Sequence, residues 1–160
     1  MVFLRFYRVQ DDESRVRLNH RGFFAEDDCR MSFQWAHHRT SPYLRGRLTK
    51  ALGNHEDWSC REPSPFISTY FDLDAARREA RRRRDQYRTE SAALSRSVKI
   101  YEIAFHPDDS WEAGLQFRKV PGLADMLGVD LSHVGNNADH EYIFLHHIPR
   151  CFIKRRLVRF

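Results

Sequence analysis

Three short segments of the chain place polar side chains inside stretches that otherwise have the composition of buried strands. They are Tyr7-Arg8-Val9, Phe66-Ile67-Ser68-Thr69-Tyr70 and Asp139-His140-Glu141-Tyr142-Ile143-Phe144. A carboxylate among bulky apolar neighbours is costly unless a partner compensates its charge. Arg8 and Ser68 are natural partners for Glu141, because an arginine offers a charge-assisted fork and a serine offers a single donor. We therefore expect Arg8, Ser68 and Glu141 to form a polar site.

The secondary structure that must position these residues follows from hydrophobic spacing and from residues that begin or end helices. Ser41-Pro42 begins a helix that Gly53 is expected to end, so residues 54–65 are predicted to be a loop. Residues 146–149 are predicted to be a turn, and residues 106–118 remain ambiguous. The sequence predicts strands over residues 3–9, 66–71, 98–105, 141–145 and 152–158, and helices over residues 42–52, 73–88 and 121–127.

The helices are expected early in the chain and most strands late, which favours an α+β fold with a largely antiparallel sheet. The length of 160 residues suits a single domain over residues 1–160, and 12 Phe in a chain that is 41% hydrophobic argue against disorder. No apolar run reaches the ~20 residues of a membrane-spanning helix. Arginines interrupt the apolar N-terminal stretch, so it is a poor signal peptide, and we expect a cytoplasmic or nuclear protein.

Cysteines and histidines give no sign of a disulfide framework or a metal centre. The three cysteines (Cys29, Cys60 and Cys151) are an odd number at wide spacing, which fits free thiols in a reducing compartment. The nine histidines include the doublets 37–38 and 146–147, yet they form no HExxH motif and no Cys-His pairing at zinc-finger spacing. The sequence therefore predicts no metal ion.

The order of the polar segments resembles the ADP-ribosyltransferase fold, specifically its arginine–serine–glutamate branch, which includes cholera-type and pierisin-type toxins. In that branch a Tyr-Arg pair ends the first strand, and a Ser-Thr strand precedes a helix with Ala near its start. A later strand opens with Glu, and an Ile-Pro turn lies several residues further on. The predicted strand over residues 98–105 also matches the middle strand of that family. The corresponding residues here are Tyr7-Arg8, Phe66-Ile67-Ser68-Thr69-Tyr70, Ala75-Ala76, Glu141 and Ile148-Pro149.

More narrowly, the segments NHEDW, SPFISTYFDLDAARREA and EYIFLHHIP resemble an uncharacterised domain family that is widespread in filamentous fungi. This second resemblance implies no reaction.

The resemblance to ADP-ribosyltransferases implies two small, mostly antiparallel sheets that form a cleft for NAD. The activity would be ADP-ribosyl transfer or NAD glycohydrolysis, with NAD as substrate. Glu141 would stabilise the oxocarbenium-like ribose, as carboxylates do in glycoside hydrolysis, and Ser68 would hold Glu141 in place. Arg8 would bind the phosphates or the ribose of NAD, and the cofactor-binding set is completed by Tyr7, Thr69 and Tyr70.

Two residues depart from the pattern of the arginine–serine–glutamate branch. The third residue of the Ser-Thr-Ser motif is Tyr70, and the residue two before the glutamate is Asp139 where active transferases often have Gln or Glu. Asp139 would lie on the acceptor side, with a reach shorter by one methylene. NAD binding is therefore better supported than transfer to a protein side chain.

Two alternatives stay open. The first is a catalytically inactive domain of the same fold that binds protein or nucleic acid through arginine-rich faces. Residues 73–88 hold seven Arg against Asp74, Glu79 and Asp85, residues 150–160 add further basic side chains without an acid, and the formal net charge is +5. The second is a different enzyme on an unrelated α+β fold, in which case the residue roles above do not apply.

Overall fold

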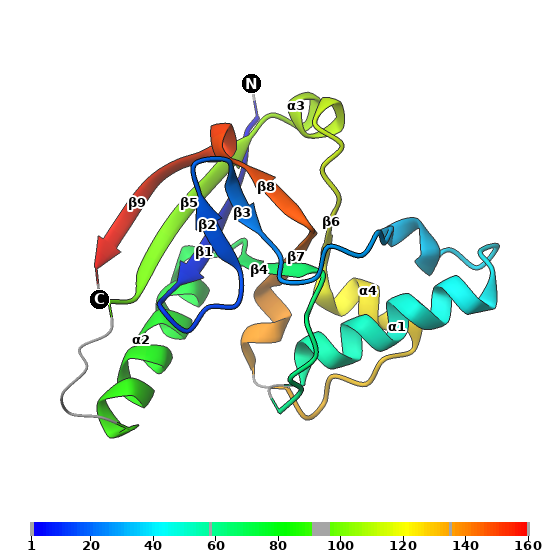
Figure 1. The fold of residues 1–160 in the computed structure, drawn as a ribbon, viewed down its shortest axis with the longest axis horizontal. Coiled ribbons are helices and arrows are strands. Elements are labelled where there is room, and N and C mark those ends of the chain that lie inside the picture. Colours follow the sequence, from blue (N-terminus) through cyan, green and yellow to red (C-terminus); the bar gives the residue numbers. More distant parts are fainter. Residues whose placement is uncertain (1, 58, 91–96, 135, 160) are drawn as a thin grey trace.

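Two antiparallel sheets form the framework of the protein. The computed structural model describes residues 2–57, 59–90, 97–134 and 136–159. The larger sheet has the strand order β6-β7-β4-β1-β5-β9 and the smaller one β2-β3-β8 (Figure 1). The strands are β1 (Leu4–Gln10), β2 (Arg17–Asn19), β3 (Gly22–Phe24), β4 (Phe66–Tyr70), β5 (Lys99–Phe105), β6 (Phe117–Lys119), β7 (Glu141–Leu145), β8 (His147–Pro149) and β9 (Ile153–Arg159).

Apart from α3, which lies near the N-terminus, the α-helices lie at two places around the larger sheet. Figure 1 shows α1 and α4 together at one end of the molecule and α2 at the other. No described helix is long and apolar enough to cross a membrane. The α-helices are α1 (Pro42–Glu56), α2 (Leu73–Glu90), α3 (Pro107–Glu112) and α4 (Val120–Leu127), and the 3-10 helices are η1 (Phe33–Ala36), η2 (Asn136–His140) and η3 (Arg150–Phe152).

Three apolar clusters fix these elements relative to one another. The first joins the two sheets around Phe6, which lies within 6 Å of five other aromatic rings. The second packs α1 and α4 against β4 and β7, with Leu48 and Leu52 of α1 fully buried. The third packs the alanine stripe of α2 against β1 and β5. The clusters hold α1, α2 and the central strands in one frame.

The expected α+β class with antiparallel sheets is confirmed. The predicted strands and helices are present, with ends that differ by a few residues. The ambiguous residues 106–118 contain α3 and the start of β6, and the predicted turn at 146–149 contains strand β8. Two of the four α-helices, α3 and α4, come after the middle of the chain, so the helices are not confined to its early part.

One difference matters for the site. The first helix was expected to end at Gly53, but α1 continues to Glu56. Gly53 does not adopt the left-handed conformation that ends many helices, and its backbone carbonyl accepts a hydrogen bond from the Asp57 amide. In contrast, Gly128 has φ 69° and ends α4 as predicted. The extra turn places His55 and Glu56 on the end of a rigid helix.

Candidate functional site

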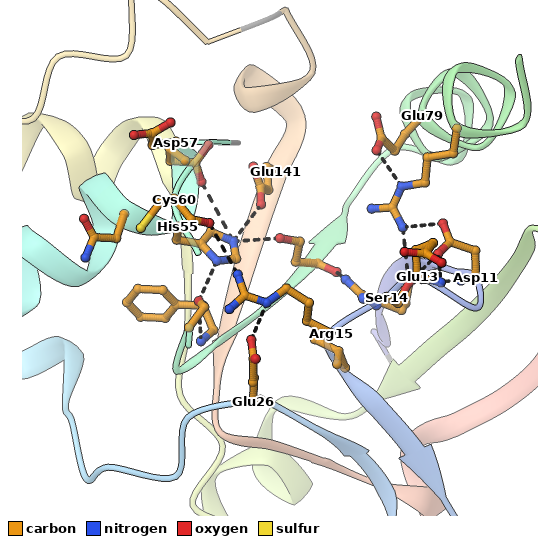
Figure 2. Close-up of a pocket in the computed structure, with 18 of the residues that line it drawn as sticks. Asp11, Glu13, Ser14, Arg15, Glu26, His55, Asp57, Cys60, Glu79 and Glu141 are labelled. Carbon is orange, nitrogen blue, oxygen red and sulfur yellow. Dashed lines mark hydrogen bonds and ion pairs between the residues drawn. The ribbon is translucent and has the colours of Figure 1, made fainter. Parts of the chain in front are cut away.

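A polar cavity of about 430 Å³ lies where β1, β4 and β7 meet the C-terminal end of α1 and the middle turns of α2 (Figure 2). Its lining includes Arg8, Ser68 and Glu141, which come from three neighbouring strands of the larger sheet. The loop between β1 and β2 and the loop before β4 complete the wall. The cavity therefore gathers residues that are up to 133 positions apart in the sequence, since Arg8 and Glu141 both line it.

Glu141 is the first residue of β7, and it lies opposite Tyr70 in the register of β4 and β7. Its exposed fraction is only 7%, which excludes a solvent-facing carboxylate. Its Oε1 lies 3.4 Å from Nε2 of His55. Ser68 was expected to hold Glu141 directly, but its hydroxyl lies 2.8 Å from the same His55 nitrogen. His55 therefore links Ser68 to Glu141.

The sequence predicted a loop over residues 54–65, and neither His55 nor Glu56 was predicted as a site residue. His55 is fixed from both sides, because its Nδ1 lies 2.7 Å from Oγ of Ser64 and its Nε2 contacts Ser68. The ring also packs edge-on against Phe66. The segment NHEDW, which contains both residues, resembles the fungal domain family, but the spacing of its residues alone predicted no role for it.

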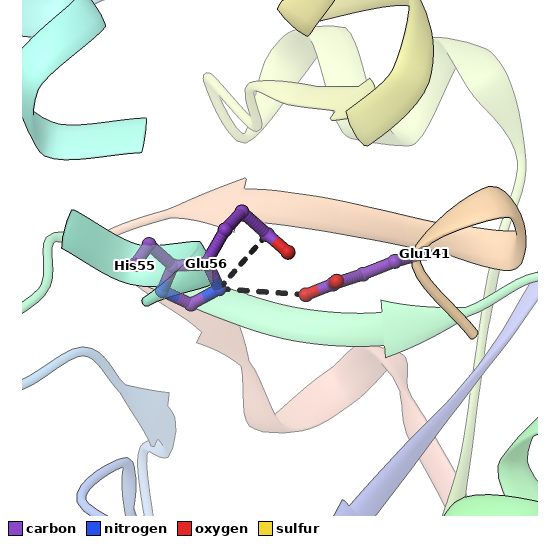
Figure 3. Close-up of side chains that lie close together, drawn as sticks. All are labelled: His55, Glu56 and Glu141. Carbon is purple, nitrogen blue, oxygen red and sulfur yellow. Dashed lines mark hydrogen bonds and ion pairs between the residues drawn. The ribbon is translucent and has the colours of Figure 1, made fainter. Parts of the chain in front are cut away.

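Glu56 is a second buried carboxyl beside Glu141 (Figure 3). Its exposed fraction is 5%, and one oxygen of its carboxyl lies within 4.8 Å of a carboxylate oxygen of Glu141. Burial, and then the charge of Glu141, raise the pKa of Glu56 to about 9. Glu56 therefore keeps its proton at neutral pH.

Arg8 lies on the central strand β1, and its side chain is almost fully enclosed, with 4% exposed. Its guanidinium donates to the carbonyl oxygen of Ser68 at 2.9 Å and to Oε1 of Gln10 at 3.1 and 3.0 Å. No carboxylate in the described part of the chain lies within 4.0 Å of it, so it forms no ion pair with Glu141. Burial, and then the nearby charge of Arg83, lower the pKa of Arg8 to about 9.

A second charged cluster lies on the α2 side of the cavity. Arg83 contacts Glu79 (Nε to Oε1, 2.7 Å) and Asp11 (Nη1 to Oδ2, 3.1 Å), and Arg82 also pairs with Glu79 at 2.8 Å. Burial alone would raise the pKa of Glu79, but its hydrogen bonds to Arg82 and Arg83 and their charges hold it below the ordinary value. These charges compensate one another, whereas no carboxylate of the described residues pairs with Arg8 within 4.0 Å.

The remaining predicted site residues lie at different distances from the cavity. Tyr70 lines it, whereas Tyr7, which pairs with Tyr70 in the strand register, does not. Thr69 is buried, and its hydroxyl donates to the carbonyl oxygen of Tyr142, so it joins β4 to β7. Asp139 lies exposed in η2 and does not line the cavity. The structure thus brings together Arg8, Ser68, Tyr70 and Glu141 and leaves the other three outside the lining.

His55, Glu56 and Glu141 also offer one nitrogen and two carboxylate oxygens that lie within 4.8 Å of one another. Such donors suit a divalent cation, although the sequence predicted no metal ion. No metal-binding motif is visible in the sequence because Glu141 is remote from the other two residues. A cation at this position would compete with the proton that Glu56 keeps at neutral pH.

Fold and site define an α+β protein whose two antiparallel sheets support a buried cluster of carboxyl, imidazole and guanidinium groups. The chain belongs to the family described as a domain of unknown function (DUF7587), whose model matches residues 4–158. No curated protein and no solved structure matches the chain.

Proposed function

We propose that the protein cleaves the nicotinamide–ribose bond of NAD and passes the ADP-ribose to water or to an acceptor. The observation that supports this function is that Arg8, Ser68 and Glu141 line one cavity from the neighbouring strands β1, β4 and β7. These residues also carry the resemblance to the arginine–serine–glutamate branch of the ADP-ribosyltransferases, in the same chain order.

The charges of the cavity complement those of NAD. Arg8 is a buried guanidinium with which no described carboxylate pairs, so it favours an anionic group. An arginine fork also suits a diphosphate better than a lysine does. The carboxylate of Glu141 favours the positive charge of the nicotinamide ring and of the ribose as the bond breaks. A dinucleotide with one anionic and one cationic part therefore complements both Arg8 and Glu141.

In the proposed reaction, the bond between C1′ of the ribose and N1 of the nicotinamide breaks, and its electron pair leaves with the nicotinamide. The ribose becomes an oxocarbenium-like cation that the Glu141 carboxylate stabilises. A water oxygen then bonds to C1′ and loses a proton. His55 is placed to accept that proton, because its Nε2 lies at 3.4 Å from Glu141 and faces the cavity (Figure 2).

The test is the release of nicotinamide from NAD by the purified protein. The change Glu141→Gln keeps the shape of the side chain and removes its charge, so turnover should fall by at least about 10²-fold with little change in the thermal midpoint. Glu112→Gln, on the exposed end of α3, is the matched control and should keep full turnover. Undiminished turnover of Glu141→Gln contradicts the role of Glu141. No release by the wild type, with cell extract supplying acceptors, contradicts the function itself.

A second candidate is a binding module that uses arginine-rich faces. The observation in its favour is that Arg78 and Arg81 lie exposed on α2, while Arg77, Arg82, Arg83 and Arg84 pair with nearby acids. If this face binds nucleic acid, affinity falls steeply with salt and with Arg78→Glu combined with Arg81→Glu. Affinity that is indifferent to both changes contradicts it.

A further inference from the structure

Glu56 is a buried carboxyl of the cavity that the reaction above does not use. It lies at the end of α1, its exposed fraction is 5%, and it lines the cavity beside Glu141. Its Oε1 is fully buried and has no hydrogen-bond donor among the described groups when both carboxyls are ionised. A buried oxygen of this kind requires a proton or another positive group nearby.

Among the described residues, no lysine or arginine pairs with Glu56, and the basic group within 4.0 Å of it is the imidazole of His55. Glu141 approaches from β7 and His55 from the same helix, with His55 Nε2 at 4.0 Å from Oε1 of Glu56 (Figure 3). The next residue, Asp57, turns its carboxylate to Ser59, and β4 contributes only the neutral Ser68 near His55. Two buried carboxyls in contact without a cation cannot both ionise, so they share one proton.

The surroundings decide which carboxyl keeps the proton. Glu141 lies closer to the imidazole, at 3.4 Å against 4.0 Å for Glu56, and it also lies in the field of Arg8. The proton therefore stays on Glu56.

We propose that Glu56 is a positioning residue that remains a neutral acid and donates a hydrogen bond to Glu141, which keeps that carboxylate oriented toward the substrate. The catalytic part of this inference rests on the proposed cleavage of NAD. The shared proton itself does not depend on any substrate. In this cavity the pair of Glu56 and His55 does for Glu141 what the resemblance assigns to Ser68 alone.

A first experiment measures the shared proton without NAD, through thermal midpoints of the wild type, Glu56→Gln and the control Glu112→Gln. Glutamine keeps a donor for Glu141 and cannot ionise. At about pH 4 the carboxyl at position 56 is protonated in the folded and the unfolded chain, so the variant and the wild type should have similar midpoints. Between about pH 5 and pH 9 only the unfolded wild type ionises there, so the advantage of Glu56→Gln should grow. The control should show no such trend.

A second experiment measures nicotinamide release against pH. Glu56→Gln should keep the neutral kcat within about threefold, whereas Glu56→Ala removes the donor and should lower kcat by about 10²-fold with a smaller change in KM. The wild-type rate should fall above about pH 9, when Glu56 loses its proton, and this alkaline loss should be absent in Glu56→Gln.

The outcomes separate the two proposals. A difference in thermal midpoint between Glu56→Gln and the wild type that does not change with pH overturns the shared proton. A Zn²⁺-dependent rise in the wild-type midpoint that Glu56→Gln abolishes also overturns it, because a cation then occupies the cluster. Equal loss of kcat in Glu56→Gln and Glu56→Ala overturns the positioning role. The expected pH trend together with no release of nicotinamide confirms the shared proton and contradicts the cleavage of NAD.

Discussion

The imidazole of His55 and the hydroxyl of Ser68 lie 2.8 Å apart, from Nε2 to Oγ, and join the end of α1 to the middle of β4. Ser64 holds the other ring nitrogen at 2.7 Å, so the orientation of the ring is fixed. The same Nε2 faces Glu141 at 3.4 Å. His55 therefore connects Ser68 to Glu141, and it belongs to the proposed reaction centre.

This relationship predicts that His55→Ala lowers kcat for NAD cleavage by about 10²-fold, because both the proton acceptor and the link from Ser68 to Glu141 are lost. Added imidazole should restore part of the rate, since the cavity left by the ring can hold it. Nicotinamide release at several imidazole concentrations checks this. A variant that imidazole does not rescue, but whose thermal midpoint has dropped strongly, would assign His55 a structural role only.

Arg8→Lys should raise the KM for NAD by about tenfold and change kcat less. Lysine keeps the charge, but it cannot span Gln10 and the Ser68 carbonyl, and it lacks the fork that matches a diphosphate. Initial rates over a range of NAD concentrations separate the two constants. If kcat falls while KM stays constant, Arg8 acts on the reacting ribose and not on the diphosphate.

Glu79→Gln should destabilise the fold by about 3 kcal/mol at neutral pH, because it leaves the buried side of Arg83 undercompensated. The pKa of Glu79 is lowered in the folded protein, so its contribution is present above the ordinary glutamate value and is lost as the pH falls through the folded pKa. Urea unfolding should therefore show a difference between variant and wild type that shrinks in acid. A difference that is constant with pH would show that the ion pair is not its source.

Gly22→Ala should prevent normal folding, with a cost of more than about 3 kcal/mol. Gly22 has φ 129°, and a Cβ there would lie 2.0 Å from the carbonyl oxygen of Ile148 in the adjacent strand β8. Gly46→Ala is the matched control, because nothing lies within 4 Å of its Cβ position in α1 and alanine favours the helix by about 0.5–1 kcal/mol. Thermal midpoints that move in the same direction for both variants would contradict this prediction.

The strands of the larger sheet could be predicted because aromatic and β-branched residues mark them. Residues 66–71 and 141–145 were located to within one residue of β4 and β7. Strand β8 could not be predicted, since His147–Pro149 is only three residues long and ends in proline. Its position depends on pairing with β3, which lies more than a hundred residues earlier and leaves no local pattern.

Part of the candidate site could be predicted in the same way. Arg8, Ser68 and Glu141 are polar residues in apolar strands, so composition alone draws attention to them. His55 and Glu56 follow Gly53 in a polar segment. The sequence alone does not show whether this glycine ends the helix or lies within it. Leu48, Leu52 and Glu56 are the buried residues of α1 and lie at helical spacing, so tertiary packing on this face continues past Gly53.

The buried guanidinium of Arg8, which pairs with no carboxylate of the described residues, has a practical consequence for ligand screening. An anion that binds the folded protein at this position, and not the unfolded chain, raises the melting temperature in proportion to the logarithm of its concentration over its Kd. A thermal-shift library of mono- and diphosphates can therefore rank ligands without any turnover. Hits that disappear in Arg8→Lys would define the chemistry of the natural ligand, whichever bond the protein breaks.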